Sequence, residues 1–328
     1  MMSSIPYSRY LIGPIPWYSF LIVTGVLIAV FLACREERRT SLPKDTVIDL
    51  ALWLLPGGII GARIYYVLFS WDSFRDNLLS VFRIWEGGIA IYGGIIGGLI
   101  VLLLFCRARR LPPLQLCDII VPGLAIAQCI GRWGNWFNIE AYGLTVTRPG
   151  LCFFPFAVQV PADGFSWHLA TFFYESLWDL FIFVFLIAAR HRMLRYQGDV
   201  FFFYVFLYAA GRLIIEELRL DSLYASSGVR ISQLLSVLLC LAVLFRYLIR
   251  FRNQGVHSAR LRLIVIPLSL MISVFALLYT VSGSFLASWT PFRIILFLSG
   301  YSFLMIVCFF ITYFSSIHRE VPDADHKA

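Results

Sequence analysis

Nine long apolar runs constrain this chain more than any other feature of its sequence. They cover roughly residues 16–34, 47–69, 88–106, 114–131, 171–189, 200–217, 231–249, 263–282 and 292–314. An α-helix rises about 1.5 Å per residue, so about 20 apolar residues cross the hydrocarbon core of a bilayer. Helices satisfy their own backbone polar groups in lipid. The runs therefore predict an all-α polytopic membrane protein.

Composition agrees with this prediction and narrows the function classes. Hydrophobic residues make up 60% of the 328 residues and charged residues 14%, against about 25% in a soluble protein. The net charge of +8 arises mostly from short loops between apolar runs, so it does not indicate nucleic-acid binding. The seven cysteines form no CxxC pair and no disulfide framework. We find no metal, nucleotide or serine-hydrolase motif and no cleavable signal peptide.

The basic residues alternate between the loops that join these runs. Loops on one side (residues 35–44, 107–110, 190–195, 246–262 and 319–327) hold 17 of the 27 Lys and Arg residues, and the opposite side holds 7. By the positive-inside rule, the richer side is cytoplasmic, which predicts an external N-terminus and a cytoplasmic C-terminus. The remaining three, Arg63, Arg132 and Arg212, fall inside or at the edge of apolar runs.

Arg132 belongs to a polar segment at a predicted membrane boundary, residues 131–143, which read GRWGNWFNIEAYG. An arginine at mid-bilayer costs at least roughly 2.5 kcal/mol, so it is retained where another group compensates its charge. An anionic lipid headgroup would do so, because the guanidinium fork suits bidentate phosphate recognition. Asn135, Asn138 and Glu140 of the same segment are candidates to surround such a headgroup.

A second polar face lies on the run at residues 200–217. Arg212, Glu216 and Arg219 are spaced i, i+4 and i+7, so one face of a helix presents all three. Arg212 and Glu216 could form a structural ion pair, line a functional site, or do both. Hydroxyl groups in or near other runs could join such a site, namely Tyr18, Tyr92 and Tyr208.

Glycines recur at helical spacing in the second and third runs, at Gly57, Gly61, Gly93, Gly94, Gly97 and Gly98. Small residues four apart let helix backbones approach closely. A broken helix, or backbone exposed to a ligand, would use glycine too. Arg63 follows Gly61 within one turn and is interpreted as structural.

Two hypotheses follow from the polar residues alone. The first is a phospholipid-headgroup site that opens toward the outer leaflet. The second is a transporter or anion pore lined by the same arginines. Transporters often contain inverted repeats, whereas the glycine-rich third run has no counterpart in the second half of this chain. Composition does not choose between the two.

The motifs favour the first hypothesis. Residues 131–143 resemble the signature G-R-x-G-N-F-x-N-x-E-x-x-G of prolipoprotein diacylglyceryl transferases. Further segments match that family in order over roughly residues 10–250, namely Trp17-Tyr18, Gly61-Ala62-Arg63, Trp85-Glu86-Gly87-Gly88, Tyr92-Gly93-Gly94, Tyr174-Glu175, Gly211-Arg212 with Glu216, Arg219 and Asp221, and Gln233-Leu234-Leu235. Together the segments are far more specific than any one of them.

The chain departs from the family pattern at three places. Tyr92 stands where some members have histidine, which leaves the general base open. Trp136 replaces a usual phenylalanine. The family's H-P-T-x-x-Y-E reads LATFFYE here, and His168 comes one place earlier.

The resemblance implies transfer of the diacylglyceryl group from phosphatidylglycerol to the lipobox cysteine of a prolipoprotein signal peptide. On this hypothesis, Arg132 and Arg212 bind the phosphate and stabilise the charge of the leaving group, and Glu140 and Glu216 orient the two arginines. Headgroup contacts or proton relay would involve Asn135, Asn138, Gly143, Tyr18, Tyr92 and Tyr208. No metal or cofactor is expected, because the lipid itself carries the activated carbon.

The same resemblance implies a domain plan and a location. A seven-helix core would cover residues 1–250, with an extracytoplasmic cap at 143–170 that reads as irregular. Two additional transmembrane helices at 251–316 are interpreted as facing lipid, and 317–328 form a polar cytoplasmic tail. The protein would be a multi-pass protein of the bacterial cytoplasmic membrane. A family paralogue with an altered substrate, or a lipid or anion transporter, remains the alternative.

Overall fold

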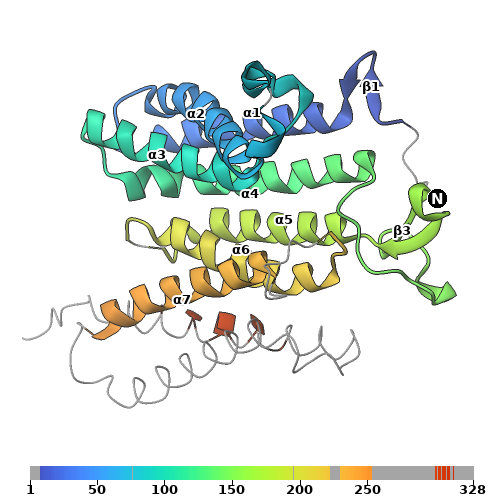
Figure 1. The fold of residues 1–328 in the computed structure, drawn as a ribbon. Coiled ribbons are helices and arrows are strands. Elements are labelled where there is room, and N and C mark those ends of the chain that lie inside the picture. Colours follow the sequence, from blue (N-terminus) through green and yellow to red (C-terminus); the bar gives the residue numbers. More distant parts are fainter. Residues whose placement is uncertain are drawn as a thin grey trace, which may run out of the picture. The chain divides into compact units, whose positions relative to one another are not determined.

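The structure is a computed structural model that describes residues 8–75, 77–194, 196–221, 230–252 and nine residues between 300 and 313. Its α-helices are α1 (Trp17–Glu37), α2 (Thr46–Phe69), α3 (Ile91–Arg109), α4 (Pro113–Asn138), α5 (Thr171–Ala189), α6 (Asp199–Leu218) and α7 (Ile231–Arg252), labelled in Figure 1. Its strands are β1 (Tyr10–Ile12), β2 (Ile15–Pro16), β3 (Ala157–Val160) and β4 (Ser166–Leu169). Its 3₁₀ helices are η1 (Trp71–Ser73), η2 (Leu78–Phe82), η3 (Ile84–Glu86), η4 (Pro149–Leu151) and η5 (Pro161–Asp163).

Each of the first seven predicted runs is a helix, which confirms the predicted helical class. Two helix ends differ from the prediction. α3 begins at Ile91 rather than residue 88, because Gly87 and Gly88 have φ of +93° and +72°, outside the helical region. α4 runs to Asn138 rather than residue 131, so Arg132 is helical, and the next residue, Ile139, leaves the helical region with a φ of +56°. The predicted run at 263–282 lies outside the described residues.

Five of the helices, α1 to α5, are long and apolar enough to cross a membrane. α6 has a similar length but carries Asp199, Arg212, Glu216 and Glu217, which lower its hydropathy. Several apolar helices of this length make the protein a multi-pass membrane protein.

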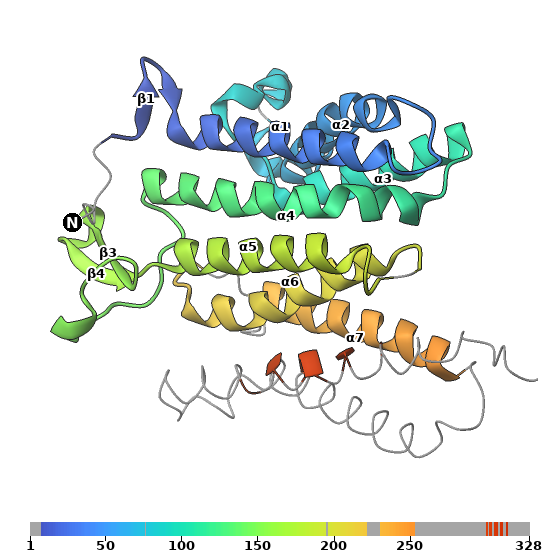
Figure 2. The same cartoon turned by 180° about the vertical axis from the view of Figure 1, so that it is seen from behind.

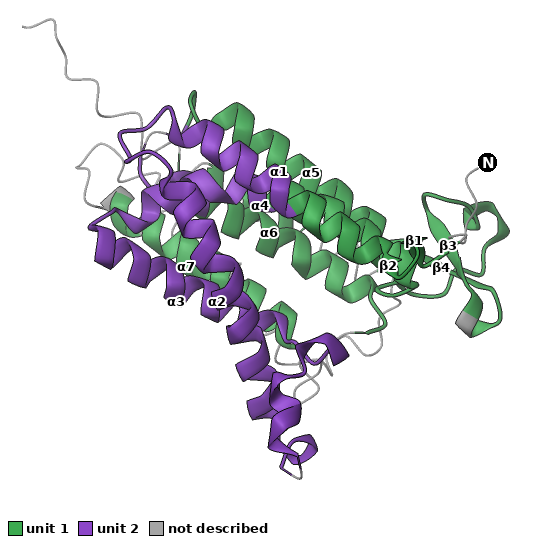
Figure 3. Ribbon diagram, turned by 90° about the horizontal axis from the view of Figure 1, so that it is seen from above, with its two compact units in different colours: residues 1–25, 125–193, 202–328 green, residues 26–124, 194–201 purple. Residues whose placement is uncertain are grey.

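The chain divides into two compact units, coloured separately in Figure 3. Unit 1 comprises residues 1–25, 125–193 and 202–328, and unit 2 comprises residues 26–124 and 194–201. α1, α4 and α6 contribute residues to both units, because the divisions fall inside these helices.

In unit 2, α2 and α3 pack through their glycines. A Cβ at Gly61 would lie 2.5 Å from the Gly93 carbonyl oxygen, and one at Gly97 would lie 2.6 Å from the Gly57 carbonyl oxygen. No larger residue fits at these points without moving the helices. The glycine pattern therefore serves close packing, and α3 is continuous from Ile91 to Arg109 rather than broken.

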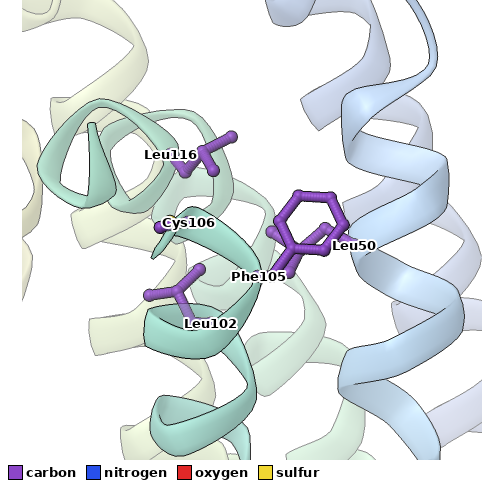
Figure 4. Close-up of a cluster of buried hydrophobic side chains, with 5 residues drawn as sticks. All are labelled: Leu50, Leu102, Phe105, Cys106 and Leu116. Carbon is purple, nitrogen blue, oxygen red and sulfur yellow. The ribbon is translucent and has the colours of Figure 1, made fainter. Parts of the chain in front are cut away.

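A buried apolar cluster joins α2, α3 and the first turn of α4 in unit 2. Figure 4 shows its five side chains, Leu50, Leu102, Phe105, Cys106 and Leu116. Cys106 is a free thiol and contributes to this cluster as a small apolar side chain.

Arg63 of α2 organises the loop between α2 and α3. Its guanidinium donates four hydrogen bonds of 2.7–2.8 Å to the carbonyl oxygens of Ser80, Val81, Gly87 and Gly88. The side chain is buried, and its charge also lies 5.1 Å from the Phe74 ring centroid. These contacts agree with a structural role for Arg63.

In unit 1, α5, α6 and α7 lie side by side in both views (Figure 1, Figure 2). Trp178 of α5 donates a 3.0 Å hydrogen bond to the Leu207 carbonyl of α6, and a side chain at Gly211 would overlap its indole. The segment between α4 and α5 is less irregular than predicted, because β3 and β4 form an antiparallel hairpin with Val158 opposite His168. This hairpin leads directly into α5.

The described residues near the C-terminus show that the last run, interpreted as facing lipid, has one face packed on the protein and another face exposed. Four buried side chains, Ser302, Met305, Phe309 and Tyr313, recur at helical spacing, whereas Phe303 is exposed. The Phe309 ring stacks on Phe206 of α6 at a centroid distance of 4.2 Å, and Ser302 Oγ donates a 3.2 Å hydrogen bond to the Ala210 carbonyl. One face of this segment therefore packs on α6, because its aromatic side chains fill space beside that helix.

Candidate active site

The predicted signature forms the end of α4 in unit 1. Arg132, Asn135 and Asn138 follow one another at three-residue steps on the last turns of this helix. Tyr18 of α1 packs against the same stretch, because a Cβ at Gly134 would lie 3.2 Å from the Tyr18 Cα. Trp17 stacks on Phe137 with a centroid distance of 4.7 Å. The start of α1 and the signature thus form one surface.

Glu175 of α5 is the central carboxylate of the site. Its Oε2 lies 2.6 Å from Arg132 Nη2, and its Oε1 accepts hydrogen bonds from Arg212 Nη1 at 2.8 Å and Arg219 Nη1 at 3.0 Å. Only 4% of the Glu175 side chain is exposed. One buried carboxylate therefore contacts three arginines from α4, α6 and the residue just beyond α6.

Two further acids complete this cluster. Glu216 Oε2 lies 2.7 Å from Arg212 Nη2, so the ion pair expected from their i, i+4 spacing is present. Asp221 accepts two hydrogen bonds from Arg219, at 2.8 and 2.6 Å, in a bidentate pair. The arginine–carboxylate cluster is defined here as Arg132, Arg212, Arg219, Glu175, Glu216 and Asp221.

The pair outside the helices, Arg219 and Asp221, perturbs both titrations. Burial alone would lower the pKa of Arg219, but the hydrogen bond and charge of Asp221, together with Glu175, outweigh it and raise that pKa. Burial would raise the pKa of Asp221, but the hydrogen bond and charge of Arg219 hold it below the ordinary value of 3.8. Both groups are therefore charged at neutral pH.

The cluster balances its own charges, with three guanidinium groups against three carboxylates. Its described partners engage one nitrogen of Arg132, Nη2, and two of Arg212, Nη1 and Nη2. Each guanidinium has five N–H donors, so donors remain for an anionic ligand. Asp179 lies one turn after Glu175 on α5 and is 2% exposed, and its Oδ2 has no hydrogen-bond partner within the described part of the chain.

Glu140 contacts amides rather than the arginines that the sequence suggested. Its Oε1 accepts hydrogen bonds from Asn135 Nδ2 at 2.9 Å and from Asn138 Nδ2 at 3.2 Å. The side-chain oxygen of Asn138, Oδ1, in turn accepts a 3.2 Å hydrogen bond from Arg9 Nε. Glu140 lies two residues past the end of α4, so its side chain reaches the amides on the last turn of that helix.

Gly143 lies at a position that excludes any side chain. A Cβ there would lie 2.6 Å from the Leu218 carbonyl oxygen and 2.7 Å from Thr171 Cγ2. Its backbone forms a β-bridge with Arg219, next to the cluster. A small hollow beside this loop is lined by Asn135, Trp136, Ile139, Glu140, Tyr142, Val158, Gln159, Val160 and Phe172.

The two remaining predicted residues occupy different units. Tyr208 of α6 lies one turn before Arg212, and its ring stacks on Tyr204 at a centroid distance of 5.8 Å. Tyr92 belongs to unit 2, where it is the second residue of α3 and half-buried. In the ranges that the structure describes, no group of three His, Cys, Asp or Glu side chains gathers as a metal site.

Sequence reasoning missed Glu175 and Arg219 as members of the site. Both were noticed as parts of the motif pattern, at Tyr174-Glu175 and at Arg219 with Asp221. Spacing along the chain does not predict these contacts, because Glu175 is 37 residues from Arg212 and 43 residues from Arg132. A carboxylate near the start of an apolar run was the available signal.

The fold and the site define a multi-pass membrane protein with a buried arginine–carboxylate cluster. A family model described as prolipoprotein diacylglyceryl transferase matches residues 9–249. The chain therefore belongs to the prolipoprotein diacylglyceryl transferase family, as its motifs suggested.

Curated relatives agree with this assignment, and each of those described here is named phosphatidylglycerol–prolipoprotein diacylglyceryl transferase. The Enterococcus faecalis protein is 42% identical over 247 residues, which are 74% of this chain and 88% of the relative. The Limosilactobacillus reuteri protein is 46% identical over 248 residues, covering 73% and 88%. The Streptococcus agalactiae protein is 44% identical over 250 residues, covering 75% and 96%.

Proposed function

We propose that this chain transfers the diacylglyceryl group of phosphatidylglycerol to the lipobox cysteine of a prolipoprotein and releases glycerol phosphate. The observation that carries the proposal is the cluster around Glu175, which holds three arginines at the signature of a transferase family. A phosphodiester is the anion that such donors suit.

The reaction exchanges one bond for another. The cysteine sulfur forms a bond to the terminal carbon of the diacylglyceryl group, and the bond from that carbon to a phosphate oxygen breaks. The electron pair leaves with glycerol phosphate, and the thiol proton must be removed. A cysteine thiol has an ordinary pKa of about 8.5, so cationic neighbours that stabilise the thiolate would assist the attack.

The role of each residue follows from charge and position. Arg132 and Arg212 stabilise the charge that develops on the leaving phosphate, and Glu175 and Glu216 hold the two guanidinium groups in place. Glu140 orients two amides for the glycerol headgroup. The proposed headgroup contacts are Asn135, Asn138, Gly143, Tyr18 and Tyr208. Tyr92 is proposed as a hydrogen-bond donor or proton relay, as are Tyr18 and Tyr208.

We place the reaction at the outer leaflet of the bacterial cytoplasmic membrane. The loops on one side of the membrane hold 17 Lys and Arg residues and those on the other side hold 7, which supports an external N-terminus. The end of α4 that bears Arg132 would then also lie on the external side. A signal peptide with its lipobox cysteine would reach the site from that side.

Arg132→Lys tests the phosphate role, because it keeps a positive charge and removes the fork. We expect a fall of at least about 10-fold in kcat/KM for glycerol phosphate release, which corresponds to the loss of one charged hydrogen bond. Arg83→Lys is the control, since Arg83 is an exposed arginine paired with Glu86. Near-normal turnover by Arg132→Lys would exclude bidentate phosphate binding there.

A further inference from the structure

The loop that follows α4 adopts an uncommon backbone conformation beside the cluster. Ile139 and Ala141 both have φ of +56°, in the left-handed region that favours glycine. A β-branched residue such as isoleucine is a rare occupant of that region. Such a conformation persists only where surrounding contacts hold it.

Three backbone groups of this loop, two carbonyls and one amide, form hydrogen bonds to residues of β4 and to the first residue of α5. Thr171 Oγ1 donates a 2.5 Å hydrogen bond to the Ala141 carbonyl oxygen. The Gly143 amide donates to the Leu169 carbonyl oxygen at 2.9 Å. The Gly143 carbonyl oxygen lies 2.9 Å from Nδ1 of His168, and because a carbonyl only accepts, Nδ1 is the donor.

His168 is itself fixed on both sides of its ring. The side chain is 2% exposed, and the strands of its hairpin contain buried and half-buried residues. Its Nε2 lies 2.9 Å from Asp163 Oδ2 and 2.8 Å from Ser166 Oγ, and the Tyr142 ring packs edge-on at a centroid distance of 5.0 Å. The pairing of His168 with Val158 in the β3–β4 hairpin fixes the position of His168 along the strand.

The contact of His168 leads directly to the cluster. Gly143 forms a β-bridge with Arg219, and the next amide, of Leu144, donates a 2.9 Å hydrogen bond to the Leu218 carbonyl oxygen. Arg219 in turn contacts Glu175. A shift of the Gly143 carbonyl would therefore move backbone that is paired with the cluster, on the side where Asn138 and Glu140 lie.

We propose that His168 is a positioning residue for the transfer reaction, which holds the Gly143 carbonyl and thereby fixes the loop between the signature helix and the arginine–carboxylate cluster. This inference rests on the proposed function. It gives a role to a histidine that neither the sequence motifs nor the chemistry of the cluster used.

Two amide substitutions separate the two sides of the ring. In His168→Asn, the amide nitrogen can occupy the place of Nδ1 and still donate to Gly143, whereas the link to Asp163 is lost. In His168→Gln, the amide reaches the place of Nε2 instead, and the Gly143 contact is lost. The two variants are matched in chemistry and differ by one methylene.

We expect His168→Gln to lower kcat by about 10- to 100-fold, as small displacements of substrate-positioning groups do. His168→Asn should stay within about threefold of the unchanged protein, and Asp163→Asn should do the same. A purely structural role for the histidine predicts similar losses in Asn and Gln. Equal impairment of both variants, or full activity of His168→Gln, would overturn the proposal.

Hydrogen exchange at residues 139–146 provides a readout that does not depend on turnover. The proposal predicts faster exchange of the Leu144 amide in His168→Gln than in His168→Asn, with both variants in the full-length chain. If the Leu144 amide exchanges at the same rate in His168→Gln as in the protein without substitutions, His168 does not hold this loop through the Gly143 carbonyl. If the protein without any substitution shows no transferase activity, the proposed function is refuted. The exchange experiment would still decide whether His168 holds the loop.

Discussion

Replacing Glu175 with glutamine removes one negative charge from the centre of the cluster while preserving the size of the side chain. The three arginines that contact Glu175 would then keep Glu216 and Asp221 as ion-pair partners within the cluster as defined, so these six residues would hold one uncompensated positive charge. The new amide NH₂ would also point a donor at a guanidinium, which offers no acceptor. Both effects disfavour the present arrangement of the arginines.

The magnitude follows from the burial of these groups. Removing one partner of a buried ion pair costs about 3–5 kcal/mol. We take the lower value, about 3 kcal/mol, because the side chains of Arg132 and Arg212 are 20% and 19% exposed. If the same interaction orients the arginines in the transition state, kcat/KM falls by about 100-fold.

The assay is transfer to a lipobox peptide, followed by glycerol phosphate release and normalised to folded protein. Glu37→Gln is the matched control. Glu37 is a buried carboxylate in unit 2 that accepts hydrogen bonds from the Thr46 and Val47 amides at 3.1 and 3.0 Å. It should lose stability but retain turnover per folded molecule. Full activity of Glu175→Gln would refute the central role assigned to Glu175.

Two further predictions concern the parts around the cluster. Hydrogen bonds from Ser166 and His168 hold the pKa of Asp163 below its ordinary value of 3.8, so its stabilising effect is complete above that value and disappears as the pH falls through the lower folded pKa. The unfolding midpoints of Asp163→Asn and the unchanged protein should therefore differ at about pH 6 and converge as the pH falls below the ordinary pKa of 3.8 and through the lower folded pKa; a constant gap would contradict this. Phe309→Ala should cost about 3–5 kcal/mol of stability in detergent, whereas exposed Phe303→Ala should change it by less than about 0.5 kcal/mol; equal effects would exclude the packing of this segment on α6.

The helices could be predicted from the sequence because apolar length is a local property. The end of α4 could not, since the polar signature residues continue the helix past the apolar run to Asn138. The hairpin of β3 and β4 was missed because its strands are four residues each and lie in an aromatic, proline-containing segment. Short strands of this kind carry too little periodicity to separate them from irregular structure.

The site shows the same limit. The Arg212–Glu216 pair follows from helical spacing alone, so the sequence predicts it. The contacts of Glu175 depend on how α4, α5 and α6 pack, which no spacing along the chain encodes. Glu140 was expected to face arginine for its charge, but its backbone position favours Asn135 and Asn138.

The most direct test of the proposed transferase activity is the mass of the acceptor peptide. Purified protein is incubated with phosphatidylglycerol and a synthetic lipobox peptide, and the peptide is analysed by mass spectrometry alongside released glycerol phosphate. We expect a diacylglyceryl mass gain on the cysteine that is lost in Arg212→Ala. An unmodified peptide, with the protein folded and binding the lipid, would contradict the proposed transferase activity.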